Sequence, residues 1–598
     1  MSDHQHLEDF FGLKPESEDP DKNQKKKEPL REAIKKNGPS VIGHVWLLPK
    51  VLSLRERYLI GILALVIIAS VIALPFTIYY HLTTAIPANG GSFAEGLVGQ
   101  PRYINPLLSQ TNDADRDISG LIYSGLLKYN AGGQLIPDLA KSYELSPDGL
   151  NYTIYLKSDA VWSDGQPVTT DDVIYTIQTI QNIDYGSSLR VNWQGVEVQK
   201  VNNATLIFKL KNRYAQFLNN LTVGILPAHI WSKLQPVNFT SSEYNLKPIG
   251  SGPYVFKKLQ KDANGRIMSY ELAANNNYYD GRPHIDGIVF KFYNNEDQML
   301  SAHNNNDIQN LAYVSPQNLK KMRFTGRLNV REIKLPRYFG VFFNQSQSAV
   351  LADKNVRMAL NYATDKQTII DTLLVGKGAA IYSPLIENVI ETSQDIARYS
   401  YNIEQAVQIL AAGGWTSGEN GILKKGKQTL SIRLTAPTFS ELASAANILK
   451  KQWSGLGISV TLDILPPAQL QQAIKERRYE ALLFGEILNP DPDPFSLWHS
   501  SQINDPGLNL ALYQNKSADS ILESARQLAN PAERLAKYSD FQNVVIADAP
   551  AVFLYNPLYL YPQSKSIKGF ESEVISTPAD RFSDIENWYI ETSRTFDK

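Results

Sequence analysis

The sequence predicts a large mixed α/β body carried by one N-terminal transmembrane helix. Two observations predict this class. Residues 58–80 contain no charged side chain, and strand-like segments alternate with capped helices from about residue 92 onward. The 598-residue chain is 43% hydrophobic and 20% charged, which is typical of a globular protein too long for a single small core. We therefore expect two or three lobes.

The uncharged run Tyr58–Tyr80 is the predicted membrane span. At about 1.5 Å rise per residue it covers roughly 35 Å, enough to cross a hydrocarbon core of about 30 Å with some tilt. A buried core helix of this length would normally show a polar face. A cleaved signal peptide remains the alternative, but its apolar core would be shorter and its charged leader would not be 57 residues long. We therefore favour an uncleaved anchor.

The distribution of basic residues predicts the orientation of this span. Lys50, Arg55 and Arg57 precede it, and no Lys or Arg follows until Arg102. Because positive charge stays on the cytoplasmic side, we expect a single-pass cell-membrane protein with a cytoplasmic N-terminus and an extracytoplasmic body. Residues 1–57 are expected to be a mostly disordered cytoplasmic tail, because the first 40 residues are polar, and residues 41–54 are expected to form a short interfacial helix. Residues 81–91, which contain Pro and an Asn-Gly-Gly run, are expected to be a flexible tether.

The segment 144–178 predicts a strand, a turn and a helix in succession. Pro147-Asp148-Gly149 is turn chemistry, and residues 151–157 alternate apolar and polar side chains as a half-buried strand does. Thr169 and Asp172 are spaced as a capping box, after which apolar residues repeat at helical spacing.

The pattern of the rest of the chain predicts further strands and capped helices. Thr364 with Gln367, Asn402, and Asn530-Pro531 are predicted to open helices. A helix from about 440 to 453 precedes a strand, as in crossover units of parallel sheets. The predicted strands lie at 204–211, 288–293, 338–344, 458–465 and 551–555.

Catalytic and cofactor motifs are missing from the sequence. The eight histidines are scattered, and there is no His-Glu-x-x-His, Walker A, G-x-G-x-x-G or G-x-S-x-G motif. The chain has no cysteine, which excludes disulfides and a thiol nucleophile, and its net charge of -1 without a basic stripe argues against nucleic acid. We therefore expect no enzyme activity, no catalytic residue, no metal site and no cofactor.

Several motifs occur in an order that resembles one protein family. The run Trp-Ser-Asp-Gly-Gln-Pro-Val-Thr at 162–169 before a helix is similar to a signature of family 5 of the extracytoplasmic solute-binding proteins, the oligopeptide- and dipeptide-binding group of ABC importers. Further motifs that resemble this family are Gly-Ser-Gly-Pro-Tyr at 250–254, the segment 353–378, the Ala-rich segment 402–415 ending in Gly-Trp, and Asp-Pro-Asp-Pro at 491–494 with Trp498.

The resemblance implies a periplasmic-binding-protein-like α/β fold, a two-lobed clamshell of type II with an extra inserted domain. Lobe I is then expected to comprise residues 92–126, 236–335 and 559–598. The extra domain is expected at 127–235, and lobe II at 336–558.

The resemblance also implies where a ligand would lie. Peptide-binding relatives hold the ligand backbone as an added strand between the lobes. The matching segments here are Thr111, Asn112 and Asp113 in lobe I and Phe484, Gly485, Glu486 and Ile487 in lobe II.

At one point the chain departs from the family pattern. Relatives that grip a free peptide amine carry an aromatic residue and an Asp where this chain has Gly485 and Leu488. Either Glu486 replaces that Asp, or the ligand has no free amine there, because a buried ammonium without an acidic partner is costly.

The implied function is that of a membrane-anchored substrate-binding subunit of an ABC importer for an oligopeptide or peptide-like solute. Its expected partners are the ligand, the permease subunits and the cytoplasmic membrane, with no nucleic acid. The alternatives are a surface receptor that senses peptide without transport, and an extracytoplasmic hydrolase or folding factor on the same scaffold.

Overall fold

The computed structural model describes residues 53–387, 396–488 and 491–596 and divides into two compact units. One unit contains Met1–Ile86 with Ser593–Lys598, and the other contains Pro87–Thr592. The predicted disordered tail lies outside the described residues except for its last five positions.

The first unit is built on a long apolar helix. Helix α5, Leu54–Leu82, begins with a capping box between Ser53 and Glu56, contains Pro75, and buries none of its residues. It is the one helix in the described ranges that is long and apolar enough to cross a membrane. It extends the predicted span at both ends.

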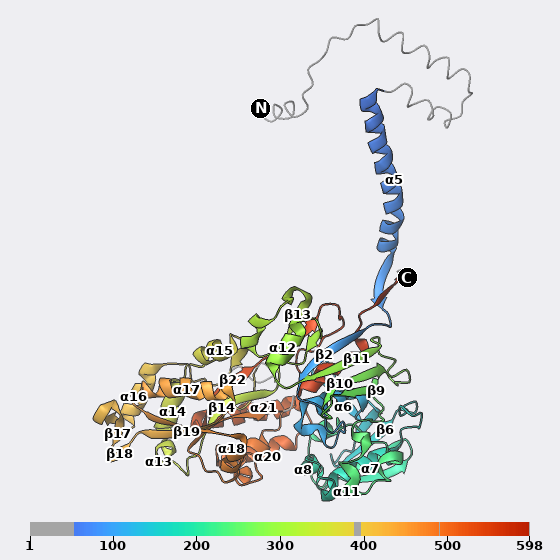
Figure 1. Cartoon of the computed structure of the whole chain (residues 1–598). Helices are drawn as coiled ribbons and strands as arrows, with labels where there is room; N and C mark the ends of the chain where they lie inside the picture. The colour runs from blue at the N-terminus through green and yellow to red at the C-terminus, as the bar shows by residue number, and fades with distance from the viewer. Residues whose placement is uncertain (1–52, 388–395, 489–490, 597–598) are drawn as a thin grey trace, which may run out of the picture. The chain divides into compact units, whose positions relative to one another are not determined.

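A small sheet follows this helix. Strand β1, Thr83–Pro87, pairs with β24, Thr592–Phe596. In the predicted tether, residues 81–82 therefore end the helix and residues 83–87 form a paired strand, which the Pro and Gly residues around them did not suggest (Figure 1).

Lobe I contains a five-stranded sheet in the order β12-β2-β11-β10-β9. Strand β2 runs parallel to both β11 and β12, and β11, β10 and β9 are antiparallel neighbours. Its strands are β2 Ser92–Val98, β9 Tyr254–Lys261, β10 Ile267–Ala274, β11 Gly287–Tyr293 and β12 Asn310–Leu311. Helices α6, Asp113–Ile122, and α12, Glu296–Asn304, belong to this lobe.

The segment 127–235, which is expected to be the extra domain and is called so below, carries an antiparallel four-stranded sheet in the order β5-β6-β8-β7. Its core is continuous with that of lobe I. The strands are β5 Ala140–Leu145, β6 Asn151–Leu156, β7 Glu197–Asn202 and β8 Thr205–Lys209. Helix α7, Thr170–Gln181, opens with the predicted Thr169–Asp172 capping box, and the short helices α8 Arg190–Trp193 and α9 Phe217–Asn220 follow.

Lobe II is organised around a six-stranded sheet in the order β15-β22-β14-β21-β19-β20. Alternate residues of its strands enter two hydrophobic clusters, as Val341 and Phe342 do. The strands are β14 Arg337–Phe343, β15 Gly378–Ala380, β19 Ser431–Pro437, β20 Ser459–Leu465, β21 Ala481–Ile487 and β22 Ala551–Pro557.

Helices contribute to both hydrophobic clusters of lobe II. The cluster with Val341 contains residues of α14 Lys354–Tyr362, α15 Lys366–Leu374, α16 Ile403–Ala412 and α17 Ser440–Ser454. The cluster with Phe342 contains residues of α18 Pro467–Lys475, α19 Phe495–Trp498, α20 Lys516–Arg526 and α21 Pro531–Asp548.

Two adjacent strands lead the chain into and out of lobe II. Strand β13, Leu328–Ile333, precedes β14, and β23, Tyr559–Ser564, follows β22. They pair antiparallel from Leu328↔Ser564 to Ile333↔Tyr559. The boundaries of lobe II at 335/336 and 558/559 stay predictions.

Lobe I also encloses a buried charge cluster. Arg581 Nη2 lies 3.0 Å from Glu95 Oε1 and 2.5 Å from Asp117 Oδ2, and all three side chains are buried. The Tyr561 hydroxyl donates to the other Glu95 oxygen at 3.0 Å.

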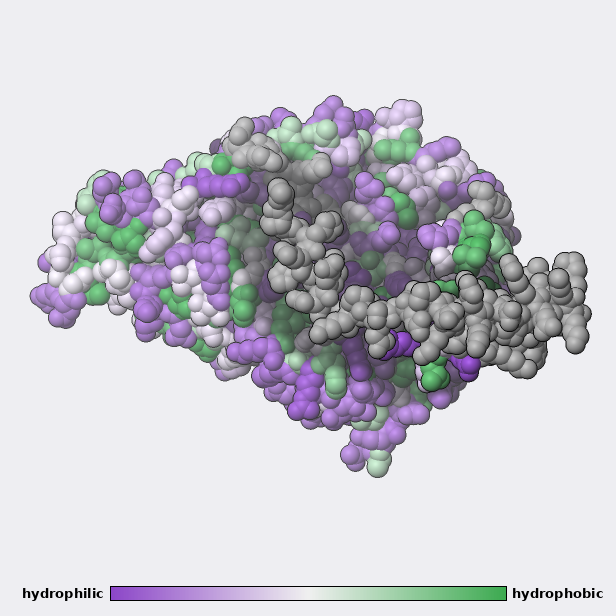
Figure 2. Space-filling model, turned by 90° about the horizontal axis from the view of Figure 1, so that it is seen from above, coloured by the Kyte–Doolittle hydropathy of each residue, from purple (hydrophilic) through white to green (hydrophobic). Residues whose placement is uncertain are grey.

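The surface of the molecule is mainly polar. Apart from the grey atoms, the face in Figure 2 is mainly hydrophilic with dispersed hydrophobic residues.

Candidate functional site

The predicted lobe II segment is a strand with one open edge. Strand β21 pairs with β14 along its whole length, from Phe343↔Ala481 to Arg337↔Ile487. On its other side it pairs with β19 only at Ala481 and Leu482. Among the described residues, no strand continues the sheet beside Phe484–Ile487.

The direction of the main-chain groups in this strand follows from one hydrogen bond. The Leu488 N–H donates to the Pro336 carbonyl at 2.6 Å, on the β14 side. Because main-chain groups alternate along a strand, Glu486 also faces β14, whereas Gly485 and Ile487 direct their N–H and C=O groups to the open edge. An added peptide strand would find its hydrogen-bond partners there.

Glu486 points into the core of lobe II. Its side chain is 3% exposed, and the Tyr338 hydroxyl donates to Oε2 while Oε1 accepts no hydrogen bond in the described structure. Burial raises the pKa of Glu486 to about 8, and the Tyr338 hydroxyl and Trp498 indole lower it by less. This placement does not support the interpretation of Glu486 as the partner of a ligand amine.

The structure also shows what surrounds the two residues that depart from the family pattern, Gly485 and Leu488. Leu488 is 4% exposed and belongs to the same core cluster as Tyr338 and Trp498. At Gly485 an added Cβ would lie 2.8 Å from Cε1 of Phe339, so the Phe339 ring occupies the space of a side chain at this position. Ile487 is exposed.

The predicted lobe I segment forms a helix start. Asn112 Oδ1 accepts the Ala114 N–H at 3.0 Å, and its Nδ2 donates to the Gln100 carbonyl at 2.9 Å. Its main-chain N–H and C=O are also bonded, to Ser109 and Arg116. Asn112 therefore caps α6, while Thr111 and Asp113 are exposed. A ligand ladder on this side stays a prediction.

Arginines neutralise the Asp-Pro segment of lobe II. Arg534 Nη2 lies 2.9 and 2.8 Å from the two oxygens of Asp491, and Arg526 Nε lies 3.0 Å from Asp493 Oδ2. Burial raises the pKa of Asp491, and Arg534 lowers it by less. Neither arginine had a sequence signal, because both lie on helices far along the chain.

The extra domain contacts this same segment. Gln216 Nε2 donates to the Pro492 carbonyl at 3.3 Å and to the Tyr538 hydroxyl at 3.1 Å. The Ala215 N–H donates to the Arg526 carbonyl at 3.2 Å. The sequence did not predict this contact between the extra domain and lobe II.

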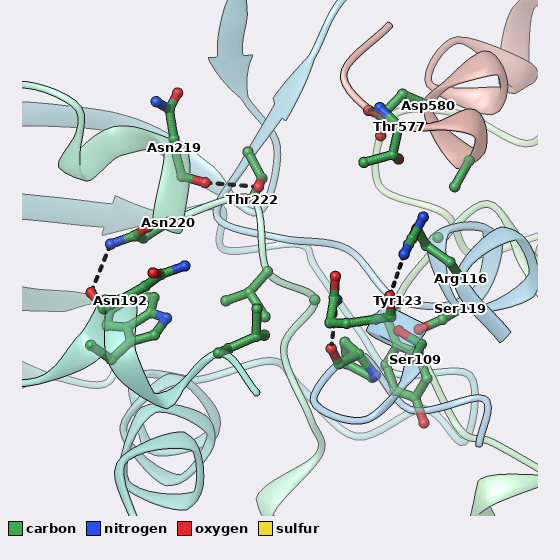
Figure 3. A pocket seen from close by; sticks show the side chains of 18 residues that line it. Ser109, Arg116, Ser119, Tyr123, Asn192, Asn219, Asn220, Thr222, Thr577 and Asp580 are labelled. Carbon is green, nitrogen blue, oxygen red and sulfur yellow. Dashed lines mark hydrogen bonds between the residues drawn. The ribbon is translucent and has the colours of Figure 1, made fainter. Parts of the chain in front are cut away.

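Two adjoining cavities of about 230 and 340 Å³ lie between lobe I and the extra domain. Figure 3 shows Arg116, Ser109 and Tyr123 of lobe I across from residues of the extra domain. Among the described residues, Arg116 Nε and Asn219 Nδ2 are buried and have no hydrogen-bond partner. Other polar residues lining both cavities are Gln110, Asn192, Asn220, Thr222, Thr577 and Asp580.

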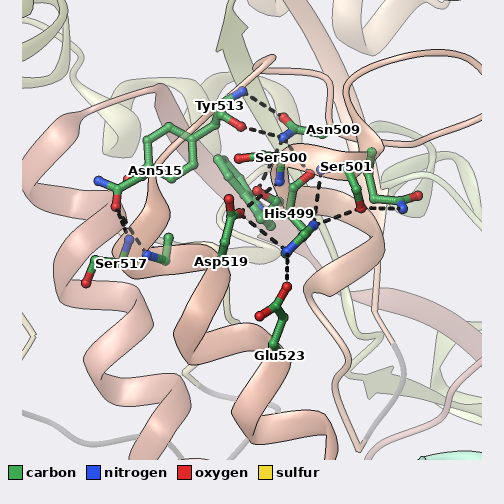
Figure 4. Close-up of polar contacts among 12 residues, drawn as sticks. His499, Ser500, Ser501, Asn509, Tyr513, Asn515, Ser517, Asp519 and Glu523 are labelled. Carbon is green, nitrogen blue, oxygen red and sulfur yellow. Dashed lines mark hydrogen bonds and ion pairs between the residues drawn. The ribbon is translucent and has the colours of Figure 1, made fainter. Parts of the chain in front are cut away.

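A polar network fixes the chain after the Asp-Pro segment (Figure 4). Asn509 Nδ2 donates to the carbonyls of Trp498, His499 and Tyr513 at 2.9–3.2 Å. The His499 ring stacks on Phe495 with centroids 4.0 Å apart, and Nε2 lies 3.3 Å from Glu523 Oε1. Within the described ranges no group of three or more His, Asp or Glu residues is placed to hold a metal ion.

Known proteins match this chain over most of its length. The family described as bacterial extracellular solute-binding proteins, family 5 middle, matches residues 134–506. The oligopeptide-binding protein AppA of Bacillus subtilis is 28% identical over 516 residues, covering 84% of this chain and 92% of AppA.

Solved structures match as well. The structure of B. subtilis AppA in complex with a nonapeptide has a TM-score of 0.68 and 27% identity, covering 85% of this chain and all of that one. NikZ of Campylobacter jejuni in complex with Ni(L-His) has a TM-score of 0.69 and 26% identity, covering 83% and 99%. These matches confirm the predicted two-lobed solute-binding fold. The chain therefore belongs to family 5 of the bacterial extracellular solute-binding proteins.

Proposed function

We propose that this chain is the membrane-anchored substrate-binding subunit of an ABC importer and that its solute is an oligopeptide or a peptide-like molecule. The observation that carries the peptide assignment is the open edge of β21, where Gly485 and Ile487 offer main-chain groups to an added strand. The similarity to AppA, whose structure holds a nonapeptide, supports it.

We do not expect a charged amino terminus of the ligand to be held by an acidic side chain of this protein. Glu486 is buried and its pKa is raised to about 8, so it is largely protonated at neutral pH and unsuited to pair with an ammonium. Asp491 and Asp493 are already paired with arginines. Main-chain hydrogen bonds therefore supply the affinity, and peptides with free and with acetylated amino ends should bind comparably.

The paired cavities are the proposed subsite for a polar, uncharged ligand group. The buried donors Arg116 Nε and Asn219 Nδ2 lack partners, and such donors are costly to leave unpaired. A carbonyl or hydroxyl oxygen would satisfy them. The charge of Arg116 is offset by Asp113, whose Oδ1 lies 3.3 Å from Nη1, so a ligand anion has little to gain there.

The anchor places this binding site outside the cytoplasm. Helix α5 is apolar over a length that crosses a bilayer, and Arg55 and Arg57 lie at its N-terminal end. The permease subunits of an ABC importer are the proposed partners on the same membrane.

Native mass spectrometry of the full chain, purified gently in detergent micelles, tests this function. We expect a retained molecule whose fragments are amino acid residues. Defined peptides, free and acetylated, should raise the melting temperature with increasing concentration. A retained molecule without amino acid residues, together with no response to any peptide, would refute the peptide assignment and leave the fold unchanged. Cleavage of the added peptides would indicate the hydrolase alternative.

A further inference from the structure

The C-terminal end of α5 is joined by a strand from the other end of the chain. Strand β1 follows α5 directly and pairs with β24. Thr83 and Arg594, which contact each other across this pair, are 511 residues apart in sequence. Two strands, rather than one, therefore extend from this end of the helix.

Arg594 caps the helix. Its Nε donates to Thr83 Oγ1 at 2.8 Å, and its Nη2 donates to the Tyr80 carbonyl at 3.0 Å and to the Thr83 carbonyl. The last carbonyls of a helix lack partners and carry partial negative charge, so a guanidinium is favourable there. Thr83 is 3% exposed beneath these contacts.

Aromatic rings surround this cap and are exposed. The Tyr79 ring meets Tyr80 and Phe596 edge-on, with centroids 6.0 and 6.2 Å apart, and Arg594 lies 4.4 Å above the Tyr80 ring. Phe596 is 65% exposed, although apolar rings of this size usually find cover.

The position of this cluster indicates what covers it. It continues the fully exposed apolar surface of α5, whose 29 residues would measure roughly 44 Å, longer than a hydrocarbon core of about 30 Å. Aromatic and basic side chains at the ends of membrane spans lie at the level of the lipid headgroups.

We propose that β24 is part of the membrane anchor, with Arg594 and Phe596 joining Tyr79 and Tyr80 in a surface that contacts the headgroup region of the outer leaflet. This inference depends on the proposed membrane-spanning role of α5. The headgroup phosphates and carbonyls are acceptors for the guanidinium, and the rings lie at the boundary with the acyl chains.

The absence of cysteine makes a depth measurement straightforward. Single-cysteine variants Phe596→Cys, Ile68→Cys and Lys427→Cys of the full chain would carry an environment-sensitive fluorophore in phosphatidylcholine vesicles. Lipids with a nitroxide at the headgroup or in mid-chain would serve as quenchers. We expect position 68 to be quenched by the mid-chain nitroxide, position 596 by the headgroup nitroxide, and position 427, an exposed turn of lobe II, by neither.

The pattern separates the two proposals. If position 596 behaves like 427 while 68 is deeply quenched, the anchor stands and the role of β24 is wrong. If 68 is also unquenched, the membrane span itself is refuted. If 596 is shielded only in vesicles that also hold the permease, the surface contacts protein and the assignment to lipid is wrong.

A second variant tests the cap. Arg594→Ala should reduce headgroup quenching at position 596 by about twofold, because the loss of a helix-end contact releases the strand. Arg478→Ala, which removes an exposed arginine of lobe II, is the control and should change nothing. Equal quenching in both variants would mean that Arg594 does not hold β24 at the membrane.

Discussion

The side chain of Asn556 is bonded to the carbonyl of Leu335 at 2.8 Å, which joins the two segments by which the chain enters and leaves lobe II. The same Nδ2 also donates to the Arg337 carbonyl at 2.5 Å, and Asn556 is fully buried. We expect Asn556→Leu to lower the free energy of unfolding by about 1–3 kcal/mol, because the buried Leu335 carbonyl and the partly buried Arg337 carbonyl lose their donor.

Denaturant unfolding of wild type and variant would measure this loss. Asn447→Leu makes the same chemical change on an exposed helix face and should stay within about 0.5 kcal/mol of wild type. Equal stability of the Asn556 variant and wild type would show that the two carbonyls find other donors.

Ile487→Pro should weaken peptide binding while leaving the fold intact. Its N–H points to the open edge, so proline removes no bond to β14. We expect the dissociation constant to rise about 2- to 10-fold, the equivalent of one hydrogen bond of ~0.5–1.5 kcal/mol. Isothermal titration with a peptide identified by mass spectrometry is the measurement. Ile487→Ala keeps the N–H and should bind like wild type; if it loses as much affinity as the proline variant, the side chain and not the ladder is responsible.

Glu486→Gln should change how stability depends on pH. The folded-state pKa is raised from 4.5 to about 8, so the folded protein binds the extra proton and wild type loses stability as the pH rises through this range. The glutamine variant stays neutral, so its free energy of unfolding relative to wild type should rise by about 4 kcal/mol between pH 5 and 9. Denaturant titrations at several pH values would show it; parallel curves for the two proteins would mean that Glu486 is ionised throughout.

The same variant distinguishes structure from ligand contact. Because the carboxyl faces Tyr338 in the core, we expect Glu486→Gln to bind free-amine and acetylated peptides as wild type does. A selective loss for free-amine peptides would restore the amine-anchor hypothesis.

Membrane fractionation tests the anchor. The full-length protein of 67 kDa should stay in the membrane fraction after carbonate washing, and external protease should remove the body while sparing the cytoplasmic tail. Recovery of a mature form that begins near Ala88 in the soluble fraction would instead indicate a cleaved signal peptide.

Local chemistry made several elements predictable from the sequence. Asn402 and Asn530 cap α16 and α21 as expected, and Thr169 with Asp172 forms the capping box of α7. These signals lie within four residues of one another, so they require no knowledge of the tertiary fold. At one cap the prediction was off by one residue: Asp365, not Thr364, caps α15, because the Thr364 hydroxyl donates back to the Leu360 carbonyl.

The site was less predictable because its geometry depends on distant segments. In the sequence, Glu486 looks like an ordinary charged residue near the end of a strand. Only its contact with Tyr338, 148 residues earlier in the chain, shows that its side chain faces the core. Likewise, Arg526 and Arg534 neutralise the Asp-Pro segment from two later helices. The pairing of β1 with β24 has no local signal at all.

The buried cluster of Arg581, Glu95 and Asp117 has a consequence for export of the chain. Arg581 leaves the ribosome 486 residues after Glu95, so both acids precede the cation that neutralises them. Two carboxylates buried without this guanidinium are strongly unfavourable. Lobe II, whose sheet comes from one continuous stretch, can fold as soon as it emerges, whereas lobe I must wait for nearly the whole chain to be translocated. A chain arrested before residue 581 would therefore expose an unfolded first lobe to surface proteases next to a folded second one.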